Sequence, residues 1–169
     1  YRSELANRLN PTSNYMHFVF DKITHDKPKR VIFAEGEEEE VIKAAMMLRD
    51  EHYGSPILVG RHSKIDPIVQ ALGEGYSLEN ITVMNAAINN NLNKYIDYLY
   101  KKLQRKGYLY RDCARLVKSD RNIFAACMMA CGDADAMVTG LTKSYYDSID
   151  DISKVIMPKK GKRIIGYSI

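Results

Sequence analysis

The stretch RVIFAEGEEEEVIKAA, residues 30–45, decides how the chain folds. Its first five residues, 30–34, form an apolar, β-branched run with the length of a buried strand. Gly36 predicts a turn directly after this strand. The apolar residues that follow recur on one helical face: Val41, Ile42, Ala45 and Leu48. The stretch therefore predicts a strand, a turn and a helix in succession.

The same alternation continues along the chain. Further strands are predicted at 56–60, 80–85 and 134–140, and helices at 65–72, 92–103, 110–117, 121–131 and 144–156. Strands that alternate with helices indicate an α/β fold, with a three-layer arrangement of a parallel sheet and helices on both faces. On the last helix, Ile149, Ile152 and Ile156 fall on one face. Tyr95, Tyr98 and Tyr100 are expected to decorate the helix that starts at Leu92.

The five glutamates around Gly36 raise the question of a phosphate site. A glycine turn that opens a helix can bind phosphate through free N–H groups and the positive end of the helix dipole. Glu35 and Glu37 to Glu40 occupy that dipole themselves and would repel an anion. The turn has a single glycine and no lysine, so it lacks the nucleotide-binding motifs. It predicts a solvated helix start that carboxylates cap.

The composition is that of a soluble globular protein. Lys and Arg (25) exceed Asp and Glu (21) by only four and the charges are interspersed, so no nucleic acid partner is expected. No apolar run approaches the roughly 18 residues of a membrane span, and no signal segment opens the chain. We therefore expect a cytoplasmic protein with no membrane partner.

Cysteines and histidines carry no metal-site pattern. Cys113, Cys127 and Cys131 have no CxxC spacing and are expected to be reduced and packed as small apolar residues. The four histidines lie apart from one another and from the cysteines, so no metal site is expected.

Residues 139–144, TGLTKS, are a candidate ligand-binding turn. In an open parallel sheet, ligands bind at the carboxyl ends of strands, and this turn follows a predicted strand. Thr142, Lys143 and Ser144 could therefore touch an anionic group. The alternative is a polar loop in which Ser144 caps the next helix.

Two carboxylate pairs are candidates for Mg²⁺ binding or for acid and base catalysis. Asp133 and Asp135 flank Ala134 just before the apolar residues of a predicted strand, and Asp150 and Asp151 lie early in a predicted helix. Turn entry and helix capping explain both pairs better than a catalytic role does.

Three stretches in order resemble the phosphate acetyl/butyryl transferase family: RVIFAEGEEEEVIKAA (30–45), SPILVGR (55–61) and MMACGDADAMVTGLTKSYYDSI (128–149). Before them, RLNPTSNYMHFVFDKI (8–23) is similar to the joining segment of large bacterial NADP-dependent malic enzymes. That segment links a malic enzyme catalytic region to a phosphotransacetylase-like domain. The resemblance implies a helical joining segment at 1–27 and the N-terminal half of a phosphotransacetylase-like domain at 28–169. Because the chain opens on Tyr1, we expect a piece of a longer polypeptide.

The resemblance also implies a ligand site and shows departures from the family. Members usually carry an arginine in a VRTN stretch, where this sequence has Val117-Lys118-Ser119-Asp120, and Arg121 lies one position beyond. Lysine offers one flexible charge where arginine offers a planar fork for phosphate. The family's catalytic residues lie in the second half of its domain, so no catalytic residue is expected in this chain. The residues expected to bind acetyl-CoA or an acyl phosphate are Lys118, Arg121, Thr139, Gly140, Thr142, Lys143 and Ser144.

Three functions are compatible with these features. The first is a region of an NADP-dependent malic enzyme that serves acetyl-CoA-responsive regulation and homo-oligomer assembly. In that case NADP and a divalent metal, Mg or Mn, belong to the parent chain, and this segment holds no cofactor. The second is part of an active phosphate acetyltransferase that uses acetyl phosphate and coenzyme A. The third is an interaction domain that self-associates through the helix bearing Tyr95 to Tyr100.

Overall fold

The computed structural model describes residues 19–20, 22, 27–159 and 161–162. The helical joining segment expected at 1–27 lies largely outside these residues. Residues Lys29–Met157 form one compact unit, which contains the sheet and the helices that pack on it. The division of the chain at residue 27 stays a prediction.

Within the described residues, four parallel strands form a sheet in the order β3-β2-β1-β4. They are β1 (Lys29–Phe33), β2 (Gly54–Val59), β3 (Thr82–Met84) and β4 (Ala136–Val138). In the register, Ile32 pairs with Ile57 of β2 and with Met137 of β4. The chain lays β2 and β3 to one side of β1 and then crosses to place β4 on the other side. This reversal creates a topological switch point between β1 and β4, where open α/β sheets bind ligands.

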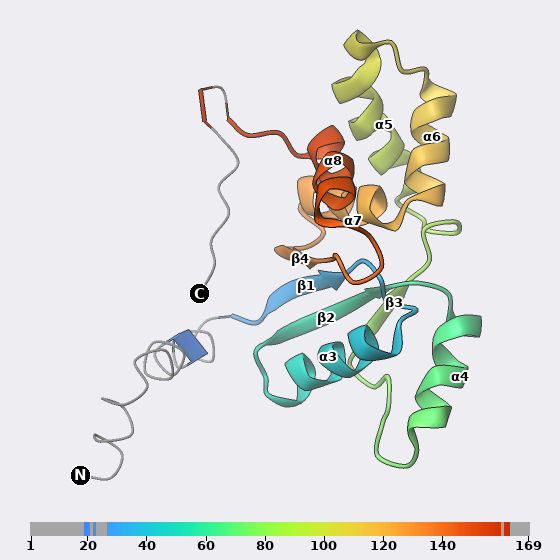
Figure 1. The fold of residues 1–169 in the computed structure, drawn as a ribbon, viewed down its shortest axis with the longest axis vertical. Helices are drawn as coiled ribbons and strands as arrows, with labels where there is room; N and C mark the ends of the chain where they lie inside the picture. Colours follow the sequence, from blue (N-terminus) through green and yellow to red (C-terminus); the bar gives the residue numbers. More distant parts are fainter. Residues whose placement is uncertain (1–18, 21, 23–26, 160, 163–169) are drawn as a thin grey trace. The chain divides into compact units, whose positions relative to one another are not determined.

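Helices cover both faces of the sheet, which confirms the three-layer α/β prediction (Figure 1). On one face lie α3 (Glu39–Asp50) and α4 (His62–Leu72), and on the other lie α5 (Leu92–Leu103), α7 (Arg121–Ala130) and α8 (Tyr145–Val155). A 3-10 turn, η1 (Gln104–Lys106), connects α5 to α6 (Tyr110–Ser119), which packs on α5 and α7. No helix within the described residues is long and apolar enough to cross a membrane.

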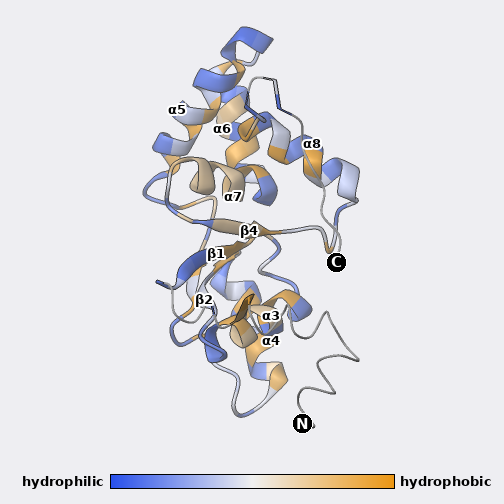
Figure 2. Ribbon diagram, turned by 90° about the vertical axis from the view of Figure 1, so that its left-hand side faces the viewer, coloured by the Kyte–Doolittle hydropathy of each residue, from blue (hydrophilic) through white to orange (hydrophobic). Residues whose placement is uncertain are grey.

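Alternating strand residues divide the core into two clusters. Phe33 and Leu58 pack with the buried face of α3 and α4, whereas Ile32 and Ile57 point to α5 and α7. Residues 122–128 of α7 are all buried, as expected for a helix of small residues and methionines against a sheet. Figure 2 shows hydrophobic residues gathered where helices meet strands and hydrophilic ones on the outer turns of α5.

Gly36 lets the chain pass closely over β2 after it leaves β1. A Cβ atom at this position would lie 2.9 Å from Leu58 Cβ and 2.9 Å from the Val59 nitrogen. The Gly36 N–H also donates to the Val59 carbonyl at 3.2 Å. The predicted turn is therefore confirmed, and the reason for its glycine is lack of space.

One detail of the helix predictions is wrong. Tyr95 does not decorate α5: it is fully buried, stacks edge-on against Phe124, and its hydroxyl donates to Asp133 at 2.8 Å. On α8 the predicted isoleucine face is only half buried, and the buried residues are Ser148, Asp151 and Val155. Apolar spacing does not reveal the polar partners that allow Tyr95 and Asp151 to be buried.

Candidate anion-binding site

The carboxylate of Glu35 closes the switch point between β1 and β4. Glu35 lies just beyond β1, after Ala34, and its side chain accepts hydrogen bonds from the backbone N–H groups of Gly140, Leu141 and Thr142 at 3.0, 2.7 and 2.8 Å. The Thr142 hydroxyl donates to the same carboxylate. The turn after β4 is thus folded around a side chain from β1, and its N–H groups are not available to a ligand.

Glu35 is 4% exposed and carries a charge that the protein favours. Burial alone would raise the pKa of Glu35, but the hydrogen bonds from Thr142, Leu141 and Gly140 outweigh it and leave that pKa below its ordinary value. The prediction of a solvated, capping Glu35 is therefore wrong, because this carboxylate binds a turn about a hundred residues away.

Glu37 is likewise not a solvated cap. It accepts from the Arg61 guanidinium at 2.8 and 3.2 Å, from the Arg61 backbone N–H at 3.1 Å and from Arg121 at 3.3 Å. The bonds from Arg61 lower the pKa of Glu37. The solvated helix start lies further on, where Glu39 and Glu40 are exposed in the first turn of α3 and pair with Lys43.

Glu37 and its two partners, Arg61 and Arg121, line a cavity of about 310 Å³ at the carboxyl ends of β2 and β3. Three cations and one carboxylate share this cavity, which we call the arginine pocket. Arg61 follows β2, whereas Arg121 opens α7 after the segment that carries Lys118. The lining residues are Glu37, Val59, Gly60, Arg61, Asn85, Ala86, Ala87, Lys118, Ser119 and Arg121. The structure thus brings two of the predicted ligand residues, Lys118 and Arg121, into one cavity.

A second cavity of about 160 Å³ adjoins the Glu35 turn. It contains the predicted residues Arg121, Thr142 and Lys143, and we call it the lysine pocket. The Lys143 ammonium donates to Asp120 at 2.6 Å and to Asp151 at 2.7 Å. Burial alone would lower the pKa of Lys143, and these two carboxylates outweigh it and raise that pKa. The ammonium is charged, but its charge is already balanced.

The remaining predicted site residues hold the turn together. The Thr139 hydroxyl donates to Asn122 at 2.6 Å, and Gly140 has a φ of 112°, which favours glycine. Ser144 accepts from the Asp147 N–H and caps α8, which confirms the capping alternative for this residue. Binding of a ligand by Thr139, Gly140 or Ser144 stays a prediction.

The carboxylate pairs serve structural contacts. Asp133 accepts from Lys94 and Tyr95, and Asp135 forms an ion pair with Arg30. Asp151 does not cap α8, because it lies in the second turn and binds Lys143 instead. The three cysteines are free thiols, as predicted. Among the residues that the structure describes, no three His, Cys, Asp or Glu side chains gather at metal-binding distance.

The chain is similar to known proteins in both sequence and fold. Residues 15–168 match the family described as phosphate acetyl/butaryl transferase. The chain belongs to this family. EutD phosphotransacetylase from Staphylococcus aureus has the same fold with a TM-score of 0.79 and 24% identity, over 90% of this chain and 44% of that one.

Relatives of two kinds match this family member. A probable NADP-dependent malic enzyme of Rickettsia prowazekii is 61% identical over all 169 residues, which make up 22% of that protein. The NADP-dependent malic enzyme of Rhizobium meliloti is 39% identical over the same length. A phosphate acetyltransferase of Staphylococcus aureus is 26% identical over 88% of this chain and 44% of its own. The chain therefore spans about a fifth of the malic enzymes and less than half of the acetyltransferase.

Three functional side chains of this family member are not predicted from its sequence. Glu35 and Glu37 have the sequence setting of helix caps, and the motifs give Arg61 no role. A signal for Arg61 is nevertheless present, because it comes directly after a buried strand, where the carboxyl edge of the sheet lies. Nothing in the sequence around Gly36 distinguishes the two glutamates that turn inward from the other three.

Exchange of Glu37 for glutamine is expected to strengthen anion binding in the arginine pocket about tenfold, or by about 1.4 kcal/mol. The exchange removes the one carboxylate among the lining residues and frees the guanidinium groups of Arg61 and Arg121. Calorimetric titration with pyrophosphate measures this change. Glu40→Gln is the matched control, because Glu40 pairs with Lys43 on the outside of α3. Equal affinities for both variants would contradict the expectation.

Proposed function

We propose that this chain is the phosphotransacetylase-like region of an NADP-dependent malic enzyme, where it serves acetyl-CoA-responsive regulation and oligomer assembly. The geometric observation that carries the proposal is a cavity whose described lining residues include three cations and a single carboxylate. The ionisable side chains that line the arginine pocket are Glu37, Arg61, Lys118 and Arg121. The match to malic enzymes over all 169 residues supports the assignment to that parent.

The chemistry of acetyl transfer explains why this pocket favours binding over catalysis. The thiol of coenzyme A must lose a proton before it attacks acetyl phosphate, so a base has to lie beside it. Glu37 is the one acidic group among the described residues that line the pocket, and its lowered pKa and its bonds to two arginines make it a weak base. Lys118, in contrast, is exposed and has no ion pair to any described residue, so it is available to the phosphate groups of acetyl-CoA.

The parent's cofactors belong elsewhere in this proposal. The turn after β1 does not fit NADP, because it has a single glycine and because Glu35 takes the neighbouring N–H groups of the β4 turn. We assign NADP and the divalent metal, Mg or Mn, to the remainder of the complete protein. Its oxidative decarboxylation of malate, like a cytoplasmic location, is part of the proposal.

The test is an assay of malate-dependent NADP reduction by the complete protein, with and without acetyl-CoA. We expect acetyl-CoA to change the rate, and we expect this ratio to fall to one when Lys118 and Arg121 are both changed to glutamine or when residues 30 onward are deleted. Lys29→Gln, an exposed change outside both pockets, is the control and keeps the ratio.

Two results would overturn the proposal. One is malate oxidation whose response to acetyl-CoA survives the double exchange and the deletion. The other is a complete protein without malate activity that forms acetyl-CoA from acetyl phosphate. The second result would establish the alternative function, phosphate acetyltransferase, which the match to the Staphylococcus aureus enzyme favours.

A further inference from the structure

Charge is distributed very unevenly between the two helical layers. The α5–α6 hairpin, residues 92–119, contains eight Lys and Arg and two Asp, which gives a net charge of +6. Residues 38–81, which include α3 and α4, contain eight Asp and Glu and four Lys and Arg, which gives −4. These layers lie on opposite faces of the sheet (Figure 1). The net charge of the chain is therefore modest because a positive region, called the basic pole (residues 92–119), and a negative region that includes α3 and α4 offset each other.

The basic pole is exposed and largely uncompensated. All eight cations of the hairpin are exposed. Among the described residues, ion pairs reach only Lys94, through Asp133, and Arg115, through a long 3.8 Å contact with Asp112. The cations without a described ion pair are Lys101, Lys102, Arg105, Lys106, Arg111 and Lys118.

The hairpin also contains a cavity of about 340 Å³, called the hairpin hollow. It opens where η1 turns into α6, and it combines the cations Lys106 and Arg115 and the carboxylate of Asp112, 3.8 Å from Arg115, with the apolar surfaces of Tyr108 and Leu116. A pocket of this kind suits an aromatic side chain that is flanked by carboxylates.

On the opposite, acidic side of the sheet, one loop carries an aromatic side chain flanked by carboxylates. The connection between α4 and β3, residues 73–80 and called the acidic loop, carries Glu74, Tyr76 and Glu79, all of them exposed. Gly73 and Gly75 have φ angles of 98° and 111°, and no other atom lies within 4 Å of where their Cβ atoms would be. The loop therefore projects from the body of the unit.

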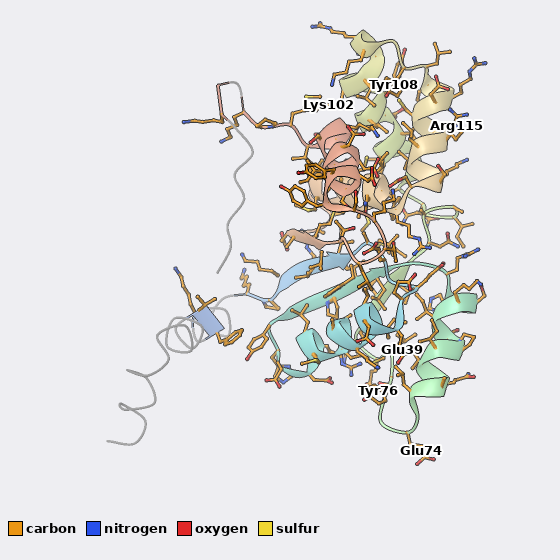
Figure 3. All side chains as sticks on the ribbon, viewed as in Figure 1. Glu39, Glu74, Tyr76, Lys102, Tyr108 and Arg115 are labelled. Atoms are coloured by element: carbon orange, nitrogen blue, oxygen red, sulfur yellow. The ribbon has the colours of Figure 1, made fainter. Side chains whose placement is uncertain are left out.

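The base of the acidic loop is anchored. Arg49 of α3 donates to the carbonyls of Ser77 and Glu79 at 2.5 and 2.8 Å. Figure 3 shows Glu74 and Tyr76 at the end of this loop, and Tyr108 and Arg115 at the far side of the unit. The loop is thus a positioned projection, and ordering it on binding costs less conformational entropy than ordering a free segment would.

We propose that the hairpin hollow of one copy of this chain receives the acidic loop of a second copy. Tyr76 enters the hollow beside Tyr108, and Glu74 and Glu79 pair with Lys106 and the neighbouring cations of the partner. Complementary charge steers the two copies together and fixes their orientation, and the tyrosine supplies the buried contact.

The opposite placement of the two surfaces decides the symmetry of the contact. A two-fold dimer would need the hairpin and the loop on the same side of the unit, so that each copy gives and receives at once. Since they lie on opposite sides of the sheet, the contact is head-to-tail, and it closes into a ring or continues as a chain of copies. This inference rests on the assembly part of the proposed function and names the surface that serves it.

Sedimentation velocity of the complete protein, without malate or acetyl-CoA, tests the contact. The hairpin variant combines Lys101→Glu, Arg105→Glu and Lys106→Glu, and the loop variant combines Glu74→Lys and Glu79→Lys. We expect each variant alone to associate at least about tenfold more weakly, and Tyr76→Ala to weaken association about tenfold. An equimolar mixture of the two charge variants is expected to regain association, because every contact between unlike copies is again charge-matched. Lys29→Glu is the control and leaves association unchanged.

Three outcomes would overturn the proposal. Association that neither variant weakens, and that salt at about 0.5 M leaves unchanged, excludes a charge-guided contact. Weakening by the hairpin variant alone assigns the hairpin a partner other than the acidic loop. Association that nuclease treatment abolishes makes nucleic acid the partner of the basic pole. A complete native protein that associates as proposed but whose malate activity does not respond to acetyl-CoA would count against the regulatory proposal alone.

Discussion

Replacing Glu35 with alanine is expected to lower the free energy of unfolding by about 3 kcal/mol. The Glu35 carboxylate accepts three backbone N–H groups and one hydroxyl from the turn after β4. Alanine leaves these partly buried donors without an acceptor, and a lost charged acceptor costs more than a lost neutral one. Urea unfolding at neutral pH measures the change.

Glu38→Ala is the matched control for this experiment. Glu38 precedes α3 but makes no side-chain cap hydrogen bond, so its exchange is expected to stay within about 0.5 kcal/mol. If Glu35→Ala costs no more than Glu38→Ala, the carboxylate does not organise the turn.

The pH dependence of stability gives an independent measure of the Glu35 charge. Because its pKa is lowered in the folded state, Glu35 stabilises the protein fully above its ordinary value of 4.5 and loses this contribution as pH falls through the folded pKa. The free energy difference between the native protein and Glu35→Gln should therefore be constant above about pH 5 and shrink in more acidic solution. A difference that grows on acidification would contradict the assignment.

Local rules are sufficient for the elements of this fold. The strand at 30–34 and the helix after Gly36 follow from apolar spacing and one glycine, and the structure has both, at Lys29–Phe33 and Glu39–Asp50. The same rules cannot give the strand order, because the crossing from β3 to the far side of β1 depends on contacts distant in sequence. Apolar periodicity also fails on α8, since Asp151 is buried by its ion pairs and not by hydrophobicity.

The candidate site is only partly predictable from the sequence. Lys118 and Arg121 are predicted from the sequence as anion ligands and do share a cavity. The sequence does not predict which charges surround these two residues, because Glu37, which is distant in the sequence, binds Arg121. From the sequence alone, a glutamate at this position predicts repulsion of phosphate. In the structure, Glu37 binds Arg61 and Arg121 and so determines how much positive charge remains for a ligand. The sequence thus reveals the sign of a local charge but not its partner.

Replacing Lys143 with methionine is expected to lower the free energy of unfolding by about 2 kcal/mol, after allowance for the partial exposure of the cluster. The exchange removes the cation between Asp120 and Asp151, whose side chains are 20% and 13% exposed. The two carboxylates then face each other with less compensation. Lys64→Met, on the exposed start of α4, is the control and should be nearly neutral.

The same variant decides whether Lys143 binds ligands or holds the turn. Burial alone would raise the pKa of Asp151, and the bonds from Lys143 and Lys154 outweigh it and lower that pKa. Asp151 therefore stabilises the fold above its ordinary value of 3.8 and loses this contribution as pH falls through the folded pKa, so the stability difference between the native protein and Lys143→Met should be constant above about pH 5 and shrink in more acidic solution. If Lys143 acts structurally, its loss changes stability and this acid profile but leaves pyrophosphate affinity within about twofold. If the affinity instead falls about tenfold in a variant that remains folded, the ammonium leaves its carboxylates to bind the anion, and the lysine pocket is part of the ligand site.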